Sequence, residues 1–261
     1  VYYNDDGTVK EIIPQDNVRP IIKKRIIKDF DKVFYPENFV VPFTDIVHDR
    51  ISVEVLRGCI RGCRFCQAGF LYRPFREKSP ETVCREAETL CGNTGYEEIS
   101  LASLSISDHS EIGKILTELI PYTEKQHINL SLPSLRVDNF SKELMDEVKK
   151  VRKSGLTFAP EAGTQRLRNV INKNVTEEEV MRTCRTAFEG GYTSVKLYFM
   201  LGLPTETDED IVGITKLAQK IVDLYYSIPG RQKGKGVQVS ISTATFVPKP
   251  FTLSLIHISE P

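Results

Sequence analysis

The chain has 261 residues, and its 35 lysine and arginine residues balance 35 aspartate and glutamate residues, so its formal net charge at pH 7 is zero. This balance gives no strong nucleic-acid signal and no basic surface for a membrane. A hydrophobic content of 40% and a charged content of 27% are ordinary for a soluble globular protein. No apolar run approaches the roughly 18 residues of a membrane span, and no signal-peptide pattern opens the chain. The six cysteines, three of them clustered, favour a reducing cytoplasm over a disulfide framework.

Residues 1–50 are predicted to be a lead-in to the main domain. Residues 1–13 have the pattern of a β-hairpin, in which Asp6-Gly7 supplies the turn with positive φ. Residues 19–44 contain scattered prolines and no sustained hydrophobic period, which predicts an extended linker. Because the chain begins at Val1 and not at methionine, we expect it to be part of a longer protein.

From residue 51 onward, apolar β-type runs alternate with amphipathic helical patterns. The alternation predicts an α/β fold with a parallel sheet and right-handed crossovers. The predicted strands are residues 51–56, 98–102, 127–132, 156–159, 194–201 and 237–246. Helix starts are predicted at Ser79-Pro80, at Asp108 with Glu111, at Ser141, at Thr176 with Glu179 and at Asp208. Two of these helices are predicted to bury an apolar face. The face after Ser141 consists of Leu144, Val148 and Val151, and the face after Asp208 consists of Ile211, Ile214, Leu217, Ala218 and Ile221.

The cysteines Cys59, Cys63 and Cys66 follow the first of these strands with the spacing C-x₃-C-x₂-C. Three soft sulfur ligands within eight residues suit an iron–sulfur cluster or zinc far better than a hard cation. The alternative is a helix with all three cysteines on one buried face. Gly58 and Gly62 argue against it, because each glycine weakens a helix by about 1 kcal/mol relative to alanine.

A closed zinc site is the main competing interpretation of the triplet. Structural zinc usually takes four protein ligands in two short pairs, and the remaining cysteines offer no second pair at that spacing. Cys84 and Cys91 lie seven apart in a helical pattern, which favours core-facing thiols. Three ligands without a fourth leave an open coordination position, and open positions are where metal centres perform chemistry.

The triplet resembles the cluster motif of the radical S-adenosylmethionine (SAM) enzymes. The resemblance implies that Cys59, Cys63 and Cys66 bind three irons of a [4Fe–4S] cluster and that the fourth iron takes the amino and carboxylate groups of SAM. Six strand–helix units fit the partial (β/α)₆ TIM-like barrel of that superfamily, here with an N-terminal hairpin and an extended linker. Chemistry in such barrels lies at the carboxyl ends of the strands.

Several polar residues follow the second and third predicted strands. Ser103 and Ser105 stand where many superfamily members carry a Gly-Gly-Glu-like segment that touches the SAM amino group. Hydroxyls replace the glycines in this chain, and a turn and helix cap explains these serines about as well. Arg136 is a candidate ligand for a carboxylate or phosphate, and a surface ion pair is the alternative.

The segment after the fourth strand resembles the Glu-Ser-Gly-Ser segment of the methylthiotransferase-like and cobalamin-linked branch. The resemblance implies that Glu161 contacts SAM, with Gly163 and Thr164 as the turn beside it. The alternative for Glu161 is an acid in the first turn of a helix, favoured by the helix dipole. Residues 202–207 resemble the Gly-Leu-Pro-Gly-Glu-Thr segment of the same branch, where Gly202 shapes a turn.

Together, further segments resemble an uncharacterised bacterial family of cobalamin-binding-domain-containing radical SAM proteins. The resemblance implies that residues 1–50 end a preceding cobalamin-binding domain, that residues 51–252 form the core, and that residues 253–261 are a non-native tail. His257 in that tail is discounted as a ligand, and a barrel with these ends is expected to close incompletely. The supporting segments are residues 66–69, 72–74, 78–81, 131–136 and 246–250.

The function that the resemblance implies is reductive cleavage of SAM by an enzyme that takes electrons from a flavodoxin or ferredoxin type of donor. Its substrate stays open among a modified nucleotide in RNA, a protein side chain and a small metabolite. Cobalamin-assisted methyl transfer or RNA modification is expected only of a full-length parent. An iron–sulfur electron-transfer or structural module without catalysis is the alternative, although such modules normally use four cysteines, and a zinc scaffold comes third. Five arginines crowd the cysteine loop and its exit, where positive charge would favour the reduced cluster and the SAM carboxylate, and solvated surface charges are the alternative for at least three of them: Arg57, Arg61, Arg64, Arg73 and Arg76.

Overall fold

The computed structural model describes residues 1–133, 136, 156–229, 234 and 236–253. Within them, strands and helices alternate along the chain from residue 51, so the predicted α/β class is confirmed. Each of the six predicted strands is present. They are β3 (Ile51–Glu54), which β4 (Leu56–Arg57) continues, β6 (Glu98–Ala102), β7 (Asn129–Ser131), β8 (Leu156–Glu161), β9 (Ser194–Leu201) and β10 (Gln238–Thr245).

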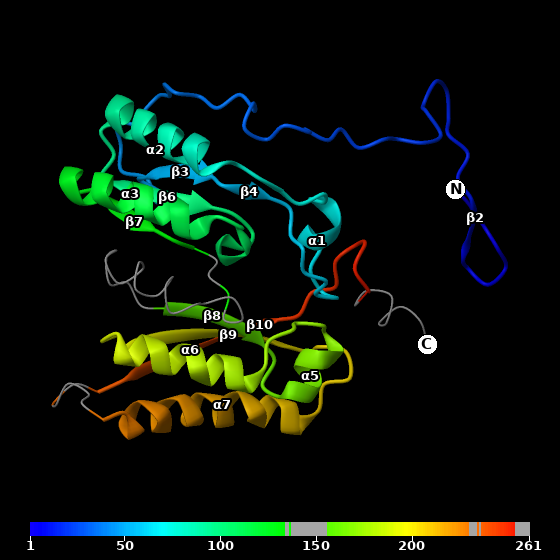
Figure 1. Cartoon of the computed structure of the whole chain (residues 1–261). Helices are drawn as coiled ribbons and strands as arrows, with labels where there is room; N and C mark the ends of the chain where they lie inside the picture. The colour runs from blue at the N-terminus through cyan, green and yellow to red at the C-terminus, as the bar shows by residue number, and fades with distance from the viewer. Residues whose placement is uncertain (134–135, 137–155, 230–233, 235, 254–261) are drawn as a thin grey trace.

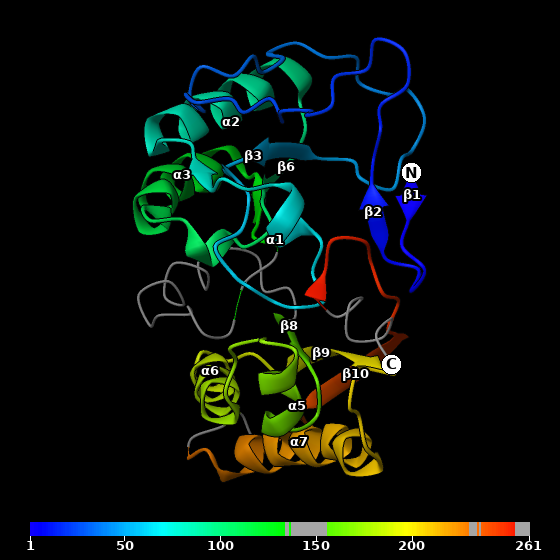
Figure 2. The same cartoon turned by 90° about the vertical axis from the view of Figure 1, so that its right-hand side faces the viewer.

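The six strands form two half-sheets, with the strand orders β3-β6-β7 and β10-β9-β8. Every neighbouring pair is parallel, as strand–helix units require. This is the partial TIM-like barrel expected from the sequence, with its halves stacked one above the other in Figures 1 and 2. Among the described residues, no ladder joins β7 to β8. The β7 strand is shorter than predicted, because His127 ends the preceding helix in a left-handed conformation.

The first half-sheet is covered by α2 (Pro80–Thr94) and α3 (Ile112–Gln126). Ser79 caps α2 as predicted by accepting a hydrogen bond from the Thr82 backbone N–H at 3.3 Å. The apolar sides of β3 and β6 pack against both helices in one core. Cys84 and Cys91 lie in this core, 8% and 6% exposed, so their prediction as core-facing thiols is confirmed. Burial raises the pKa of Cys84 to about 12 and that of Cys91 to about 11.

The predicted helix start at Asp108 with Glu111 is wrong. Asp108 ends the short 3₁₀ helix η1 (Ile106–Asp108), and α3 begins at Ile112 without a side-chain cap. The carboxylate of Asp108 instead accepts two hydrogen bonds from the guanidinium of Arg61, which lies in the cysteine segment. The Asp108 carboxylate therefore forms a long-range ion pair with Arg61 and does not cap a helix.

The second half-sheet is covered by α6 (Glu177–Glu189) and α7 (Asp208–Ser227), while the short α5 (Gln165–Val170) follows β8. The predicted capping box of α6 is confirmed, since Thr176 and Glu179 exchange both hydrogen bonds. The predicted apolar face of α7 is wrong at Ile211, which is 42% exposed, whereas its other members are buried. Asp210, which is 2% exposed, takes the inward position.

The lead-in has the predicted form. β1 (Tyr2–Tyr3) and β2 (Val9–Glu11) form an antiparallel hairpin, and residues 12–50 contain neither helix nor strand. The hairpin stands apart from the barrel, and the linker passes over the α2 side of the first half (Figures 1 and 2). The predicted helix from Ser141 and the tail after Leu253 lie outside the described residues.

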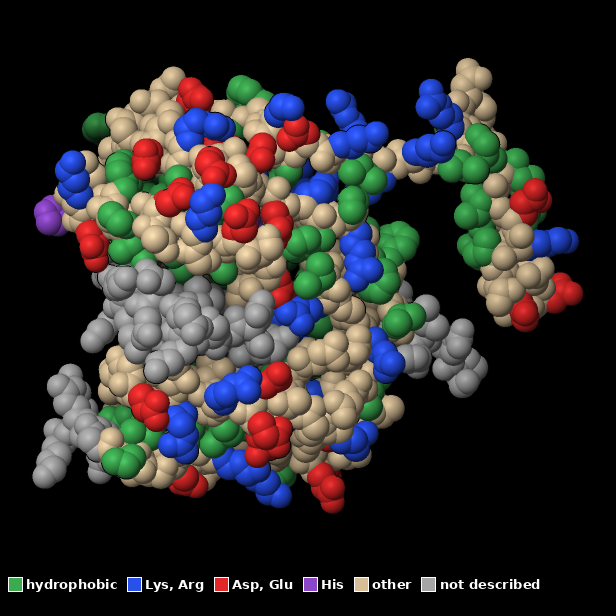
Figure 3. Space-filling model, viewed as in Figure 1, with side chains coloured by type: hydrophobic (Ala, Val, Ile, Leu, Met, Phe, Trp, Pro, Cys, Tyr) green, Lys and Arg blue, Asp and Glu red, His purple; other side chains and the backbone are tan. Residues whose placement is uncertain are grey.

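Acidic and basic side chains are interspersed over the helices seen in Figure 3, in line with the zero net charge. No helix in the described part of the chain is both long enough and apolar enough to cross a membrane.

Candidate metal centre

The cysteines lie on a loop, residues 58–75, which we call the cysteine loop. It leaves β4 and returns through β5 (Arg76–Glu77), which pairs antiparallel with β4, and it contains the short helix α1 (Ala68–Leu71). Gly58 opens the loop with φ +97°. A Cβ there would lie 2.8 Å from the carbonyl oxygen of Tyr72 and 2.9 Å from that of Pro74, so the returning chain packs directly on the glycine. Only glycine fits this position without a backbone shift.

All three cysteines of the loop are free thiols, with Cys63 buried and the other two partly exposed. The backbone N–H of Arg61 points at Cys59 Sγ at 3.4 Å, and that of Cys66 donates to the Cys63 carbonyl at 3.1 Å. In the described part of the chain, no three His, Cys, Asp or Glu side chains gather closely enough to enclose a single metal ion. Thiolates that bind different irons of one cluster need not meet at one point, so this donor set fits an iron–sulfur cluster.

Two cations lie near the buried thiol. Burial is the largest influence on Cys63 and raises its pKa, while the positive charges of Lys173 and Arg136 oppose the rise. The other two cysteines raise the Cys63 pKa further, so both lie within electrostatic reach of Cys63. Two basic side chains from outside the cysteine loop thus offset part of the burial that disfavours the Cys63 thiolate.

The cysteine loop is tied to both halves of the barrel. Arg61 binds Asp108 beyond β6, with Arg61 Nε 3.0 Å from the Asp108 carboxylate. On the other half, Arg64 donates its backbone N–H to the Ile171 carbonyl at 2.9 Å and its Nη1 to the Val170 carbonyl at 2.7 Å. Asn172 Nδ2 donates to the Gly62 carbonyl at 2.7 Å. Arg61 and Arg64 thus connect the loop to the two halves of the barrel and are not merely solvated charges.

Glu161 lies at the carboxyl end of β8 with φ +69°. Its Oε1 accepts from Lys173 Nζ at 3.1 Å, and both side chains are largely buried. The Lys173 ammonium also lies 5.9 Å from the ring centroid of Phe65, which stands between Cys63 and Cys66. The alternative role of Glu161 as a first-turn acid is wrong, because α5 begins only at Gln165. A contact of Glu161 with SAM stays a prediction.

Gly163 and Thr164 form the turn that follows Glu161. A Cβ on Gly163 would clash with the Asp210 carbonyl and the Ile214 backbone N–H of α7, so the turn packs on that helix. Thr164 caps α5 by accepting from the Leu167 N–H at 3.2 Å, and its hydroxyl donates to the Asp210 carboxylate. Both residues are engaged in shaping the turn, and their predicted part in SAM binding is not tested by these contacts.

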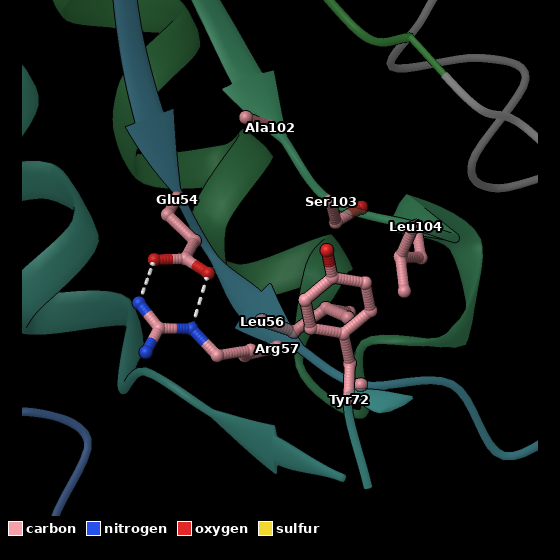
Figure 4. Close-up of a pocket in the computed structure, with 8 residues that line it drawn as sticks. Glu54, Leu56, Arg57, Tyr72, Ala102, Ser103 and Leu104 are labelled. Atoms are coloured by element: carbon pink, nitrogen blue, oxygen red, sulfur yellow. Dashed lines mark hydrogen bonds and ion pairs between the residues drawn. The ribbon is translucent and has the colours of Figure 1, made fainter. Parts of the chain in front are cut away.

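Ser103 lines a cavity of about 350 Å³ at the carboxyl ends of β3 and β6, close to Gly58 (Figure 4). Among the described residues, its buried hydroxyl oxygen has no hydrogen-bond partner. Glu54 and Arg57 line the cavity and form a bidentate ion pair. Arg57 Nε donates to Glu54 Oε1 at 2.8 Å, and Arg57 Nη2 donates to Glu54 Oε2 at 2.6 Å. In Figure 4 the Tyr72 ring lies on the Ser103 side and the ion pair on the other. The cavity therefore offers polar groups at both ends.

The other two predicted polar residues lie nearby. Ser105 is buried and is the N-cap residue of η1: its carbonyl accepts the Asp108 backbone N–H at 3.2 Å, although its side chain makes no cap hydrogen bond, so the turn of the alternative interpretation is present. The backbone N–H of Arg136 donates to Ser107 Oγ at 3.1 Å, and its guanidinium Nη2 to the Lys173 carbonyl at 3.4 Å. These contacts link the polar segment after β6 to the loop that carries Lys173.

A second cavity of about 460 Å³ opens beside the cysteine loop at the carboxyl ends of β9 and β10. Its lining includes Phe65 and Cys66 from the cysteine loop, and Met200 and Phe246 from β9 and the end of β10. A mostly apolar pocket with a thiol on its wall suits an organic molecule held against a metal centre.

Sequence reasoning missed Lys173. It lies between α5 and α6 in a segment that carries no motif, and its place beside Cys63 depends on contacts between distant parts of the chain. A weak local sign exists, since Asn172 and Asn174 flank it with φ of 52° and 49°. Asparagine tolerates this left-handed backbone, so an Asn-Lys-Asn run predicts a tightly turned loop around the lysine.

A family model described as the radical SAM superfamily matches residues 53–218, which is more than half of the chain. An uncharacterised protein of Methanocaldococcus jannaschii is 30% identical over 250 residues, which cover 96% of this chain and 51% of that protein. A tRNA-2-methylthio-N(6)-dimethylallyladenosine synthase of Pelotomaculum thermopropionicum is 24% identical over 182 residues, or 66% of this chain and 40% of the synthase. The chain thus spans about half the length, or less, of these curated relatives.

A solved structure with a similar fold is that of the radical S-adenosylmethionine methyltransferase TsrM from Kitasatospora setae with cobalamin and a [4Fe–4S] cluster bound. The TM-score is 0.61 at 16% sequence identity, and the match covers 80% of this chain and 36% of the methyltransferase. At this identity the likeness concerns the fold alone.

Proposed function

The chain belongs to the radical SAM superfamily, and from that membership we propose that it is the core of an enzyme that cleaves S-adenosylmethionine reductively. When bound, a [4Fe–4S] cluster supplies the electron that breaks a carbon–sulfur bond of SAM, and the 5′-deoxyadenosyl radical released abstracts hydrogen from the substrate. The observation that carries the proposal is the cysteine loop after β4, whose residues 58–75 include three free thiols and no other Cys, His, Asp or Glu.

Cys59, Cys63 and Cys66 would hold the cluster. The loop contributes rigidity through Gly58 and through its ties to Asp108 and to the α5 segment. Lys173 and Arg136 add positive charge beside Cys63, which favours thiolate ligands and a more reducible centre. Burial of Cys63 limits access of water to that ligand.

Glu161 would bind the SAM end of the site, with Gly163 and Thr164 holding the turn that aims it. Its carboxylate is already paired with Lys173, so the pair presents an acceptor and a donor side by side. An acceptor suits ribose hydroxyls or an ammonium, and a donor suits a carboxylate. We also assign Ser103, Ser105 and Arg136 to the SAM site, where Ser103 keeps a hydroxyl available for a polar ligand group.

For the whole protein we propose methyl or methylthio transfer, with electrons delivered by a flavodoxin or ferredoxin type of partner. The support is the curated synthase that modifies tRNA adenosine and the cobalamin-bound methyltransferase of similar fold. We also propose the domain division made from the sequence, with a lead-in at residues 1–50, a core at 51–252 and a tail at 253–261. A non-catalytic iron–sulfur module is the competing proposal, and it would bind the cluster without consuming SAM.

One experiment separates these proposals. Anaerobically reconstituted protein is mixed with dithionite and SAM, and 5′-deoxyadenosine and bound iron are measured together. Cleavage of SAM that depends on bound iron supports the enzyme. Iron without cleavage supports the non-catalytic module, and zinc without iron removes both.

A further inference from the structure

Phe30 is buried within a segment whose neighbours are largely exposed. Its side chain is 3% exposed, although it belongs to the extended linker that precedes the barrel. Phe34, four residues further along, is 87% exposed. The linker therefore does not simply lie on the surface, because it inserts one aromatic ring into the first half of the barrel.

Three cations surround the Phe30 ring. The guanidinium carbons of Arg57 and Arg76 lie 5.0 and 6.0 Å from the ring centroid, and the Lys78 ammonium lies 5.6 Å from it. All three distances are within the range of cation–π attraction. Lys78 is itself buried, where it pairs with Glu86 at 2.5 Å and lies 4.5 Å from the ring of Tyr35. The linker thus covers a buried charge pair with two aromatic rings.

These cations close the base of the cysteine loop. Arg57 in β4 and Arg76 in β5 are directly opposed in the short antiparallel ladder from which residues 58–75 project. Like charges directly opposite each other destabilise a strand pair. Glu54 compensates Arg57, and the Phe30 ring attracts both arginines at once. The Phe30 ring therefore offsets the repulsion between the two opposed arginines of the β4–β5 ladder.

Hydrogen bonds between side chains and backbone hold the same segment in place around Phe30. Asp31 Oδ1 accepts from the Ser79 N–H at 2.7 Å, and the Ile27 carbonyl accepts from Arg76 Nη1 at 3.3 Å. Lys24 Nζ donates to the Arg73 carbonyl at 3.0 Å, near the exit of the cysteine loop. The linker therefore contacts both the β4–β5 ladder, through Arg76, and the end of the cysteine loop, through the Arg73 carbonyl.

We propose that Phe30 is a positioning residue for the cluster ligands, because it holds the two ends of the cysteine loop together. This inference rests on the proposed function for its link to iron. The residue lies outside residues 53–218, so it is supplied by the linker and not by the matched core. Loss of the ring leaves two opposed arginines without their shared partner, and the loop opens from its base.

The test compares Phe30→Leu, Phe30→Tyr and the matched surface control Phe34→Leu in the full chain. Leucine keeps an apolar side chain and loses the ring face, whereas tyrosine keeps it. Amide hydrogen exchange is measured on the cluster-free protein, and chelator-driven iron loss is measured on the reconstituted protein. We expect Phe30→Leu to speed exchange within residues 58–75 and iron loss by about tenfold each, without change in α6 and α7. Phe30→Tyr and Phe34→Leu should match the wild type.

Two results would overturn the inference. One is unchanged exchange in the cysteine loop of Phe30→Leu, and the other is an equal increase in α6 and α7, which would indicate general destabilisation. Unchanged iron loss despite faster loop exchange also overturns the link to the cluster. If the wild type binds no iron, the proposed function fails, and loop exchange alone still decides whether Phe30 anchors the loop.

Discussion

Lys173 Nζ lies 3.1 Å from Glu161 Oε1, and the same ammonium acts on the thiol of Cys63. One cation therefore joins the carboxyl end of β8 to the cysteine loop. The pair is largely buried, so removal of either charge leaves the other poorly compensated. A ligand that binds between Glu161 and the cysteines would have to share this cation.

Glu161→Gln is expected to weaken SAM binding by about tenfold while the iron content stays unchanged. The substitution removes a charged acceptor worth roughly 1.5–3 kcal/mol in a hydrogen bond, but no cluster ligand. Equilibrium dialysis of SAM against the reconstituted variant measures the loss, and iron content is measured on the same sample. Glu189→Gln, at an exposed position, serves as the control. Unchanged SAM affinity in Glu161→Gln would assign Glu161 to the structural ion pair alone.

Much of the fold followed from local sequence patterns. The bounds of β9 agree residue for residue with the apolar run 194–201, and the capping box of α6 is where Thr176 and Glu179 predicted it. Both features depend on neighbours along the chain, either alternating burial or a side chain reaching its own helix.

The failures share a different cause. Asp108 was expected to cap a helix, but Arg61 binds it from 47 positions away. Ile211 was expected in the core, but Asp210 is buried there because the α5 segment and the start of α7 both donate to it. Lys173 reaches Cys63 through the packing of two distant loops. Periodicity and spacing carry no information on such long-range polar contacts.

Asp210→Asn is expected to destabilise the protein at pH 7 by about 1–3 kcal/mol, because a buried carboxylate with several donors loses its charge. The donors include Arg166, Thr164 and the Thr207 N–H at 2.9 Å. Burial alone would raise the pKa of Asp210, but these hydrogen bonds outweigh it and hold the pKa below the usual range. Because the folded-state pKa is depressed, the stabilisation is present above the unfolded pKa, near 3.9, and is lost as pH falls below it.

Urea unfolding of the wild type and Asp210→Asn at pH 7 and at lower pH measures this dependence. The difference in unfolding free energy should be largest at pH 7 and should shrink below about pH 4. An equal difference at every pH would mean that shape and not charge makes Asp210 important.

Substitution of any one of Cys59, Cys63 and Cys66 by alanine is expected to abolish cluster assembly. Each would remove one of three thiolate ligands, and a fourth cysteine does not lie in the loop. Cys84→Ala, Cys91→Ala and Cys184→Ala are the matched controls, since these thiols are buried in the helix–sheet cores. Anaerobic reconstitution followed by iron and sulfide analysis should give about four of each per chain in the controls. Full iron content in a Cys63→Ala variant would contradict the ligand assignment.

Gly58→Ala is expected to reduce iron incorporation at least tenfold without removing a ligand. The added methyl would meet the Tyr72 and Pro74 carbonyl oxygens within 3 Å, and φ of +97° is strained for alanine in any case. The returning chain must then lift off the start of the cysteine loop, which displaces Cys59 beside it. Gly92→Ala is the control, because a Cβ there meets nothing within 4 Å and alanine favours the helix interior of α2 by about 1 kcal/mol. Iron content, circular dichroism and thermal unfolding are measured on both variants. A Gly58→Ala protein that folds and assembles its cluster like the wild type would show that the close packing on Gly58 does not position the cysteines.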